Sequence, residues 1–302
     1  MTAEPPALSP DLVTQLATAG LDAAAVENLV LAALAEDLAG GVDVTSAATV
    51  PASQRAVGDF VARASGVVSG LAVAQVVMEV VTDGRGQFDV LAEDGDRVQR
   101  GDILATVKGR TRDLLTGERT ALNLLCHLSG VATLTRAWVD AVAGTGAAVR
   151  DTRKTTPLLR ALEKYAVRCG GGVNHRMALS DAALVKDNHV VAAGGVAPAF
   201  DAVRAMWPGV PVEVEVDSLE QLVEVLAAGA DLVLLDNMAV DQMREAVRLV
   251  DGRARLEASG GLTLDTARAV AETGVDFIAV GALTHSAPVL DIALDLRAAV
   301  SG

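Results

Sequence analysis

The chain has 302 residues, of which 51% are hydrophobic, so it is long and apolar enough for about two domains with buried cores. This composition excludes a disordered chain. A net charge of −14 and only seven aromatic residues argue against a nucleic-acid-binding surface. The longest stretch without a charged residue, 120–135, has 16 residues and is interrupted by polar ones, whereas a membrane span needs roughly 20 apolar residues. No basic residue precedes Arg55, so the N-terminus lacks the basic start of a secretory signal, and we expect a cytoplasmic protein.

The basic residues are concentrated in one part of the chain. Between Arg153 and Lys186 there are seven Lys or Arg against two acidic residues, a local charge of +5. In an acidic chain, such a concentration is typical of a site for a small anion. Three of the seven, Arg160, Lys164 and Arg168, are spaced i, i+4 and i+8, and for these we favour a solvent-exposed helix face.

Residues 1–129 are expected to form an α/β sandwich domain. The apolar pattern predicts helices at 22–38 and 71–81. Short runs rich in β-branched residues predict strands at 59–63, 67–69, 88–92 and 103–107. Gly95–Asp102 is similar to the hairpin turn of biotinyl and lipoyl carrier domains, but it contains no lysine to carry a cofactor. We therefore interpret it as a structural hairpin.

The domain boundary is predicted at a glycine. Two helices are expected at 113–128 and 131–143, separated by Ser129-Gly130. A second domain then covers 130–287, and the C-terminal segment 288–302 can pack back on the first domain.

Residues 130–287 are predicted to form an incomplete α/β barrel. Runs at 212–216, 232–235, 254–257 and 277–280 begin 20 to 23 residues apart and alternate with helical stretches such as 218–228. Two earlier runs, 147–151 and 182–186, extend the series. At about 22 residues per unit this gives six or seven strands, fewer than the eight of a complete barrel, which uses about 250 residues.

Polar residues follow all six of these strands. They are Asp151–Thr156, Lys186–His189, Glu215 with Asp217, Asp236 with Asn237, Ser259–Gly261, and Gly281–His285. In α/β barrels the loops after the strands meet at one end and carry the catalytic groups. We therefore expect an active site built from these loops.

Glu213, Glu215 and Asp217 alternate with valines, so the three acids share one face of their strand. If the valines pack against the helices, the acids point into the barrel, where they need Lys154, Lys186 or Mg²⁺ to stay ionised. The alternative is an edge strand with a solvated acidic face.

Two kinds of anion site are predicted. The loops at Gly260-Gly261 and Gly281 can present backbone N–H groups to a phosphate. Arg153-Lys154 and Asn174-His175-Arg176 offer cations suited to a carboxylate. For His127 we favour a partnered core histidine.

Eight motifs in one order carry a resemblance to a known family. They are Gly117–Asn123 (GERTALN), Ser129–Thr133 (SGVAT), Asp151–Pro157 (DTRKTTP), Asn174–Arg176 (NHR), Lys186–His189 (KDNH), Glu213–Asp217 (EVEVD), Leu256–Gly261 (LEASGG) and Gly281–His285 (GALTH). The chain resembles the quinolinate phosphoribosyltransferases, the decarboxylating nicotinate-nucleotide pyrophosphorylases of de novo NAD synthesis. The resemblance covers nearly the whole chain, including Glu36-Asp37 and Asp43–Ser46. Two positions depart from the pattern, since Leu158 and Ala178 stand where the family commonly has glycine.

The resemblance implies an N-terminal α/β sandwich and a seven-stranded α/β barrel, assembled as homodimers or multiples of dimers. It also implies which residues hold the two carboxylates of quinolinate. They are Arg153, His175, Arg176 and Lys186, with Arg119 supplied by a second subunit.

The second substrate is phosphoribosyl pyrophosphate (PRPP), with Mg²⁺ as cofactor. The implied PRPP and Mg²⁺ contacts are Lys154, Glu215 and Asp236, and the implied 5-phosphate site is Ser259, Gly260, Gly281 and His285. The expected catalytic residues are Lys154, Lys186, Glu215 and Asp236. Of these, Glu215 and Asp236 are the expected Mg²⁺ ligands, directly or through water or substrate.

The implied chemistry agrees with these residues. The quinolinate nitrogen attacks ribose C1 as pyrophosphate leaves, and the cationic ring then loses CO₂, so no protein nucleophile is required. The competing functions are a nicotinate phosphoribosyltransferase, a paralogue of this fold associated with molybdenum transport, and a non-catalytic anion-binding protein. Intact Lys154, Glu215 and Asp236 argue against the last of these.

Overall fold

The computed structural model describes residues 8–298, so 1–7 and 299–302 of the predicted terminal segments lie outside the described residues. The chain folds into two compact units. The first comprises Met1–Leu134, Pro157–Gly170 and Ala287–Gly302, and the second comprises Thr135–Thr156 and Gly171–Ser286. The chain first passes from one unit to the other after Leu134, close to the boundary predicted at Gly130. Residues 157–170, which we placed in the barrel, belong to the first unit.

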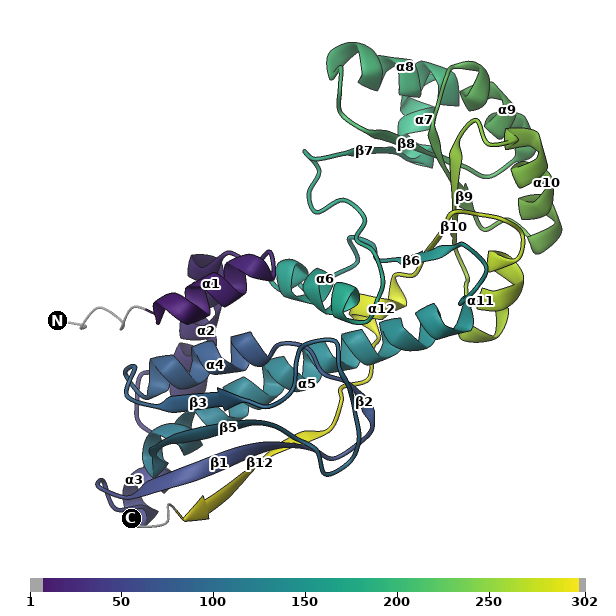
Figure 1. Cartoon of the computed structure of the whole chain (residues 1–302). Coiled ribbons are helices and arrows are strands. Elements are labelled where there is room, and N and C mark those ends of the chain that lie inside the picture. The colour runs from purple at the N-terminus through teal and green to yellow at the C-terminus, as the bar shows by residue number, and fades with distance from the viewer. Residues whose placement is uncertain (1–7, 299–302) are drawn as a thin grey trace. The chain divides into compact units, whose positions relative to one another are not determined.

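The first unit is built on a four-stranded antiparallel sheet with the order β12-β1-β5-β3 (Figure 1). Its strands are β1 (Arg55–Ala62), β3 (Gln87–Val90), β5 (Ile103–Arg110) and β12 (Ile292–Ala298). Strand β12 comes from the C-terminal segment and pairs antiparallel with β1. Two short strands, β2 (Gly66–Val67) and β4 (Arg97–Val98), pair separately, and β4 lies within the segment interpreted as a hairpin.

Helix α4 (Leu71–Val81) packs on this sheet, and α1 (Pro10–Thr18) and α2 (Ala23–Leu38) pack on α4. The other helices of the first unit are α3 (Val44–Thr49), α6 (Arg160–Cys169) and most of α5 (Thr111–Ala141). Figure 1 shows α4 and the first part of α5 running along the sheet. Helix α4 has the predicted bounds and is buried over most of its length. Within residues 8–298, no single helix is both long enough and apolar enough to cross a membrane. The bent pair α1 and α2 reaches that length and apolar composition only when the two helices are counted together.

Helix α5 is continuous, so the predicted break at Ser129-Gly130 is wrong. A Cβ atom on Gly130 would lie only 2.2 Å from the carbonyl oxygen of Pro288. Ser129 exchanges hydrogen bonds with the backbone of Ser69, accepting at 3.0 Å and donating at 3.2 Å. The glycine is therefore needed for close packing of a neighbouring segment, and the serine for a tertiary contact, and neither ends the helix.

The solvent-exposed position predicted for Lys164 is also wrong. Lys164 and Glu163 on α6 are both 0% exposed. Glu163 lies 2.8 Å from Nε2 of His127, so His127 has a partner as predicted, but its side chain is 25% exposed and not in the core. Tyr165 donates a 2.8 Å hydrogen bond to Asp94. These contacts bind α6 to the first unit and explain why it is not part of the barrel.

The second unit contains a six-stranded sheet with the order β6-β11-β10-β9-β8-β7, and all its strand pairs are parallel. Its strands are β6 (Ala148–Arg150), β7 (Ala183–Val185), β8 (Val212–Val216), β9 (Leu232–Asp236), β10 (Arg255–Ser259) and β11 (Phe277–Ala279). Val173 adds a parallel bridge to Arg150 at the seventh strand position. Among the described residues no backbone pairing joins Val173 to β7, so the sheet stays open. The prediction of an incomplete, about seven-stranded barrel is confirmed.

Helices α8 (Val196–Met206), α9 (Leu219–Ala227), α10 (Val240–Val250) and α11 (Leu264–Ala271) lie on the outside of the curved sheet (Figure 1). Helix α7 (Asp187–Ala193) follows β7, and the short α12 (Ala282–His285) follows β11. Strand β8 lies between β7 and β9, its three valines are buried, and Glu213 is only 3% exposed. The alternative of an edge strand with a solvated acidic face is therefore excluded.

Candidate active site

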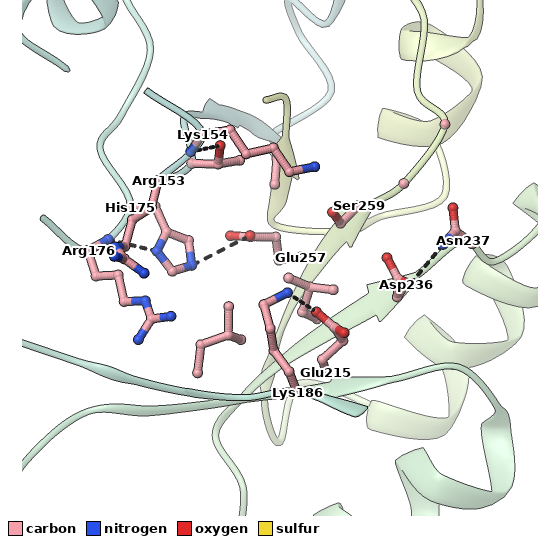
Figure 2. Close-up of a pocket in the computed structure, with 16 residues that line it drawn as sticks. Arg153, Lys154, His175, Arg176, Lys186, Glu215, Asp236, Asn237, Glu257 and Ser259 are labelled. Carbon is pink, nitrogen blue, oxygen red and sulfur yellow. Dashed lines mark hydrogen bonds and ion pairs between the residues drawn. The ribbon is translucent and has the colours of Figure 1, made fainter. Parts of the chain in front are cut away.

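A cavity of about 590 Å³ opens at the carboxyl ends of the barrel strands (Figure 2). Its lining residues all belong to the second unit. They are Thr152, Arg153, Lys154, His175, Arg176, Leu184, Lys186, Glu215, Leu234, Asp236, Asn237, Glu257, Ser259, Gly260, Gly261 and Ala279. Nine of the predicted site residues are among them, namely Arg153, Lys154, His175, Arg176, Lys186, Glu215, Asp236, Ser259 and Gly260. The barrel thus brings together loops that are far apart in the sequence.

Two more predicted residues lie beside Lys154. A Cβ atom on Gly281 would stand 2.9 Å from Cδ of Lys154 and 3.3 Å from Nε2 of His285. The hydroxyl of Thr284 donates a 2.9 Å hydrogen bond to the carbonyl oxygen of Lys154. The loop after β11 therefore supports the Lys154 backbone. The remaining predicted residue, Arg119, lies on α5 in the first unit.

Asp151 organises the loop that carries His175 and Arg176. It follows β6 and is fully buried. One of its carboxylate oxygens accepts a 2.8 Å hydrogen bond from the backbone N–H of His175, and the other accepts a 2.5 Å bond from the side-chain amide of Asn174. A buried carboxylate satisfied in this way fixes where the loop leaves the barrel.

Both ring nitrogens of His175 form hydrogen bonds with the protein. The backbone N–H of Arg176 donates to Nδ1 at 2.7 Å, and Nε2 lies 2.6 Å from Oε2 of Glu213. The side chain of His175 is only 8% exposed. Oε1 of Glu257 lies 3.8 Å from the same Nε2, so two buried carboxylates flank one imidazole.

Glu257 is a cavity residue that the sequence analysis did not assign. Arg150 donates a 2.7 Å hydrogen bond to its Oε2. Burial, and then the nearby charge of Glu213, raise the pKa of Glu257 to about 7, although His175 and Arg150 oppose this shift. Glu257 lies two residues before Ser259 on β10, so the alternation that we applied to Glu213 and Glu215 would have placed it on the cavity face.

Arg153 and Arg176 form the cationic side of the cavity (Figure 2). Burial lowers the pKa of Arg176, and the positive charge of Arg153 lowers it further. Arg176 donates a 3.0 Å hydrogen bond to the carbonyl oxygen of Ala182. Within the described residues, Nε of Arg153 is buried without a hydrogen-bond partner. Two neighbouring guanidinium groups of this kind favour a ligand with more than one negative charge.

The opposite side of the cavity pairs acids with bases and amides. Lys186 donates a 2.7 Å hydrogen bond to Glu215, and the side-chain amide of Asn237 donates a 2.7 Å bond to Asp236. Gly260 has φ +91°, and a Cβ atom there would lie 2.2 Å from Oδ1 of Asn237. Only glycine fits at this position because Asn237 packs against it. At the next residue, Gly261, the space that a Cβ would occupy is open.

Two family models match the chain, one in each part of the sequence. Residues 43–129 match the model described as the N-terminal domain of quinolinate phosphoribosyl transferase, and residues 131–295 match its C-terminal domain. The nicotinate-nucleotide pyrophosphorylase [carboxylating] of Mycobacterium leprae is 56% identical over 277 residues, which cover 90% of this chain and 97% of that protein. The quinolinate phosphoribosyltransferase [decarboxylating] 1 of Nicotiana glauca is 38% identical over 290 residues, covering 90% of this chain and 82% of that protein.

Solved structures agree with the sequence relatives. NadC from Streptococcus pyogenes superposes with a TM-score of 0.87 at 40% identity, and covers 97% of this chain and 99% of its own. The nicotinate-nucleotide pyrophosphorylase from Francisella tularensis has a TM-score of 0.86 at 36% identity, with 98% and 100% coverage. Both domains are therefore shared with these proteins over almost their full length.

Proposed function

The chain belongs to the quinolinate phosphoribosyltransferase family, and on this premise we propose how its barrel carries out the family reaction. The reaction transfers the phosphoribosyl group of PRPP to quinolinate with loss of CO₂. It yields nicotinate mononucleotide and pyrophosphate, a step in NAD biosynthesis. The enzyme is thus a decarboxylating pentosyltransferase.

One observation carries the assignment of this reaction to the cavity. Four cationic side chains and three carboxylates from different strands and loops line the same space; they are Arg153, Lys154, Arg176, Lys186, Glu215, Asp236 and Glu257. The reaction needs both kinds of charge. Its substrates are polyanions, whereas the ribose becomes positively charged in the transition state.

We assign the carboxylates of quinolinate to the side of the cavity where Arg153, His175 and Arg176 lie, with Lys186 opposite and Arg119 of a second subunit completing the site. Nε of Arg153 is buried and has no hydrogen-bond partner in residues 8–298, and this, with the proximity of Arg176, supports the placement. Leu184, Leu234 and Ala279 supply apolar lining suited to the flat faces of a pyridine ring.

PRPP is assigned to the side of the cavity where Lys154, Asp236 and Ser259 lie. Lys154 faces the pyrophosphate, and the 5-phosphate lies against Ser259, Gly260, Gly281 and His285. The open space beside Gly261 in the same loop and the position of Gly281 next to Lys154 support this placement. Glu215 and Asp236 stabilise the positive charge on the ribose, and the departing pyrophosphate leaves toward Lys154.

The donor set fits Mg²⁺. Glu215 and Asp236 offer hard carboxylate oxygens on the cavity wall, and two carboxylates suit an ion that keeps several waters and binds substrate phosphates. We propose that these residues hold it directly or through water or PRPP. When bound, Mg²⁺ would neutralise charge on the leaving pyrophosphate.

The assay that tests this function combines the chain with quinolinate, PRPP and Mg²⁺. Nicotinate mononucleotide and CO₂ should form in equal amounts, and nicotinate should be a poor substrate because the cavity has more cations than one carboxylate needs. Equal turnover of nicotinate would instead support a nicotinate phosphoribosyltransferase. Binding of both substrates without turnover would support the anion-binding alternative. The homodimer and the cytoplasmic location stay predictions.

A further inference from the structure

The loss of CO₂ leaves a ring carbon that must gain a proton. Once the quinolinate nitrogen carries the ribose, the bond between ring carbon C2 and its carboxylate breaks, and the electron pair of that bond stays on C2. Nicotinate mononucleotide has a hydrogen at C2 in place of the carboxylate. At neutral pH neither quinolinate nor PRPP has a strongly acidic hydrogen, so an acid of the protein or a water molecule must supply it.

Glu257 lines the cavity between the positions assigned to the two substrates. It lies on β10 two residues before Ser259, and both residues line the cavity. Its Oε1 is 3.8 Å from Nε2 of His175, on the side assigned to the carboxylates, whereas Ser259 is on the side assigned to PRPP. Figure 2 shows Glu257 between these two groups. The bond from ring to ribose forms between the same two sides, and C2 is next to the ring nitrogen that forms it.

One oxygen of Glu257 is available to carry a hydrogen. Oε2 accepts the 2.7 Å hydrogen bond from Arg150, whereas Oε1 is buried and has no hydrogen-bond partner within residues 8–298. A buried, ionised carboxylate needs donors at both of its oxygens, and this arrangement supplies a donor at one of them. A hydrogen on Oε1 is therefore favoured, and no hydrogen bond within the described residues engages that oxygen.

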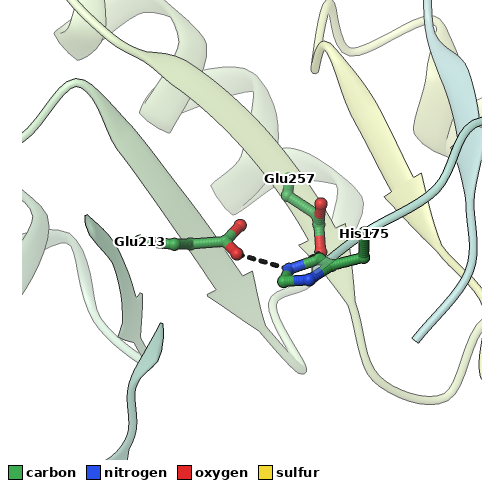
Figure 3. Close-up of side chains that lie close together, drawn as sticks. All are labelled: His175, Glu213 and Glu257. Atoms are coloured by element: carbon green, nitrogen blue, oxygen red, sulfur yellow. Dashed lines mark hydrogen bonds and ion pairs between the residues drawn. The ribbon is translucent and has the colours of Figure 1, made fainter. Parts of the chain in front are cut away.

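The surroundings of Glu257 also favour its acid form. Its partners on the two neighbouring strands are apolar, Leu234 on β9 and Phe277 on β11. Figure 3 shows the carboxyl groups of Glu213 and Glu257 next to one imidazole, that of His175. Because burial and the charge of Glu213 outweigh the nearby bases, the pKa of Glu257 is about 7, and much of it holds a hydrogen at neutral pH. The charged and titratable groups that act on it are Glu213 on β8, Arg150 on β6 and His175.

The cations of the cavity are less suited to give up a proton. Its two guanidinium groups keep their protons in proteins. The ammonium group of Lys186 lies 2.7 Å from Glu215, and Lys154 is assigned to the pyrophosphate. Glu257 is the remaining acid on the side of the cavity where the carboxylate departs.

We propose that Glu257 is the acid that protonates C2 of the ring after CO₂ has left. The hydrogen on Oε1 passes to the electron pair on C2, so that a C2–H bond forms, the O–H bond breaks and Glu257 becomes a carboxylate. One proton from water restores the acid before the next turnover. The acid form also lets the quinolinate carboxylates approach, whereas an ionised Glu257 would repel them. This inference rests on the proposed function and concerns its last step.

Glu257→Gln separates the two steps of the reaction. Its amide can still accept the hydrogen bond from Arg150, but it cannot protonate a carbon. Exchange of labelled pyrophosphate into PRPP in the presence of quinolinate measures phosphoribosyl transfer, and labelled CO₂ from quinolinate measures decarboxylation. In the variant, this exchange should be at least as fast as in the unmodified chain, whereas CO₂ release in a single turnover should fall at least about tenfold. The Kd values for quinolinate and PRPP should stay within about threefold of the unmodified chain.

The pH dependence of the second step gives an independent readout. In the unmodified chain, single-turnover CO₂ release should slow as the pH rises through about 7, because Glu257 then loses its hydrogen. Glu257→Gln should show no such fall. Glu257→Asp keeps an acid that is one methylene group shorter, so it should retain the fall with pH at a lower rate. Glu163→Gln is the matched control and should behave as the unmodified chain, because Glu163 is also fully buried beside a histidine but lies in the first unit.

Three results would overturn the proposal. If Glu257→Gln released CO₂ as fast as the unmodified chain, water or another residue would be the donor. If pyrophosphate exchange and CO₂ release fell together in that variant, Glu257 would have only a structural role. If CO₂ release by the unmodified chain became faster as the pH rose through 7, Glu257 would act as an anion. Failure of the proposed function would look different, since the unmodified chain would then form no nicotinate mononucleotide.

Discussion

The ammonium group of Lys186 lies 2.7 Å from Oε2 of Glu215, and this ion pair joins the carboxyl ends of neighbouring strands β7 and β8. The lysine side chain is 48% exposed, whereas that of Glu215 is 12% exposed. A carboxylate entering the cavity can therefore attract Lys186 while Glu215 stays in place. If the substrates bind as proposed, binding of the acid substrate would leave Glu215 available to the ribose.

Lys186→Ala is expected to weaken quinolinate binding by about 1.5–3 kcal/mol, the usual range for a hydrogen bond to a charged group. This corresponds to roughly a 10- to 150-fold rise in Kd, measured by titration calorimetry. Arg176→Ala should have an effect in the same range. Lys108→Ala is the control, because Lys108 forms an exposed 3.1 Å pair with Asp89 in the first unit. If Lys186→Ala or Arg176→Ala bound quinolinate with the affinity of the unmodified chain, the substituted residue would not be part of the carboxylate site.

Glu257 is expected to make stability depend on pH. Its pKa is raised from the usual 4.5 to about 7 in the folded chain, chiefly by burial. Between these two pH values the folded state holds more protons than the unfolded state, so the free energy of unfolding falls as pH rises. Glu257→Gln removes this dependence, and the variant should gain stability relative to the parent between pH 5 and pH 8.

Chemical denaturation at pH 5 and at pH 8 measures the free energy of unfolding of Glu257→Gln and of the parent. Glu245→Gln, on the exposed face of α10, is the control and should not change the pH dependence of unfolding. If the free energy of unfolding changed with pH by the same amount in Glu257→Gln and in the parent, Glu257 would have the same pKa in the folded and unfolded states, and the prediction would be wrong.

Leu158→Gly is expected to stabilise the chain. Leu158 is 90% exposed and has φ +68°, a left-handed conformation that costs an L-residue about 1–2 kcal/mol. Glycine removes this strain but adds about 0.4–1 kcal/mol of unfolded-chain entropy, so a net gain of about 0.5–1 kcal/mol remains. Calorimetry should show Tm rising by about 1–4 °C. Leu179→Gly is the control, because Leu179 is also exposed but has no positive φ, and its Tm should fall. A fall in Tm for Leu158→Gly as well would show that Leu158 is not strained.

Much of the site could be predicted because it follows from strand periodicity. The carboxyl ends of parallel strands meet at one edge, so Lys186, Glu215 and Asp236 come together once the strands are located. Glu257 obeys the same alternation as Ser259, but its strand holds a single acid and shows no repeated pattern.

What the sequence could not indicate depends on tertiary packing. Gly130 looks like a helix break until the backbone of Pro288 is known to pass beside it. The i, i+4 spacing of Arg160 and Lys164 places them on one face of a helix, but it does not say which face packs inward. Burial of Lys164 is decided by contacts of α6 within the first unit, which involve residues more than 30 positions away, such as His127.

Arg119 poses a question of assembly. It lies on α5 in the first unit, whereas Arg153 lines the cavity of the second unit. The family resemblance places both at the quinolinate carboxylates, with Arg119 coming from a second subunit. Arg119→Ala and Arg153→Ala should therefore each be inactive or nearly so on their own.

Mixing these two variants tests whether the sites are shared. If Arg119 acts in trans, each mixed dimer has one site with both defects and one site with neither. Equal amounts of the two chains, unfolded together and reassembled at random, give mixed dimers in half of the population, so activity should return to roughly a quarter of the wild-type value. Reassembly of each variant alone is the control and should restore nothing. If Arg119 acts in cis, every site keeps one defect, and the absence of any recovery in the mixture would require the shared site to be abandoned.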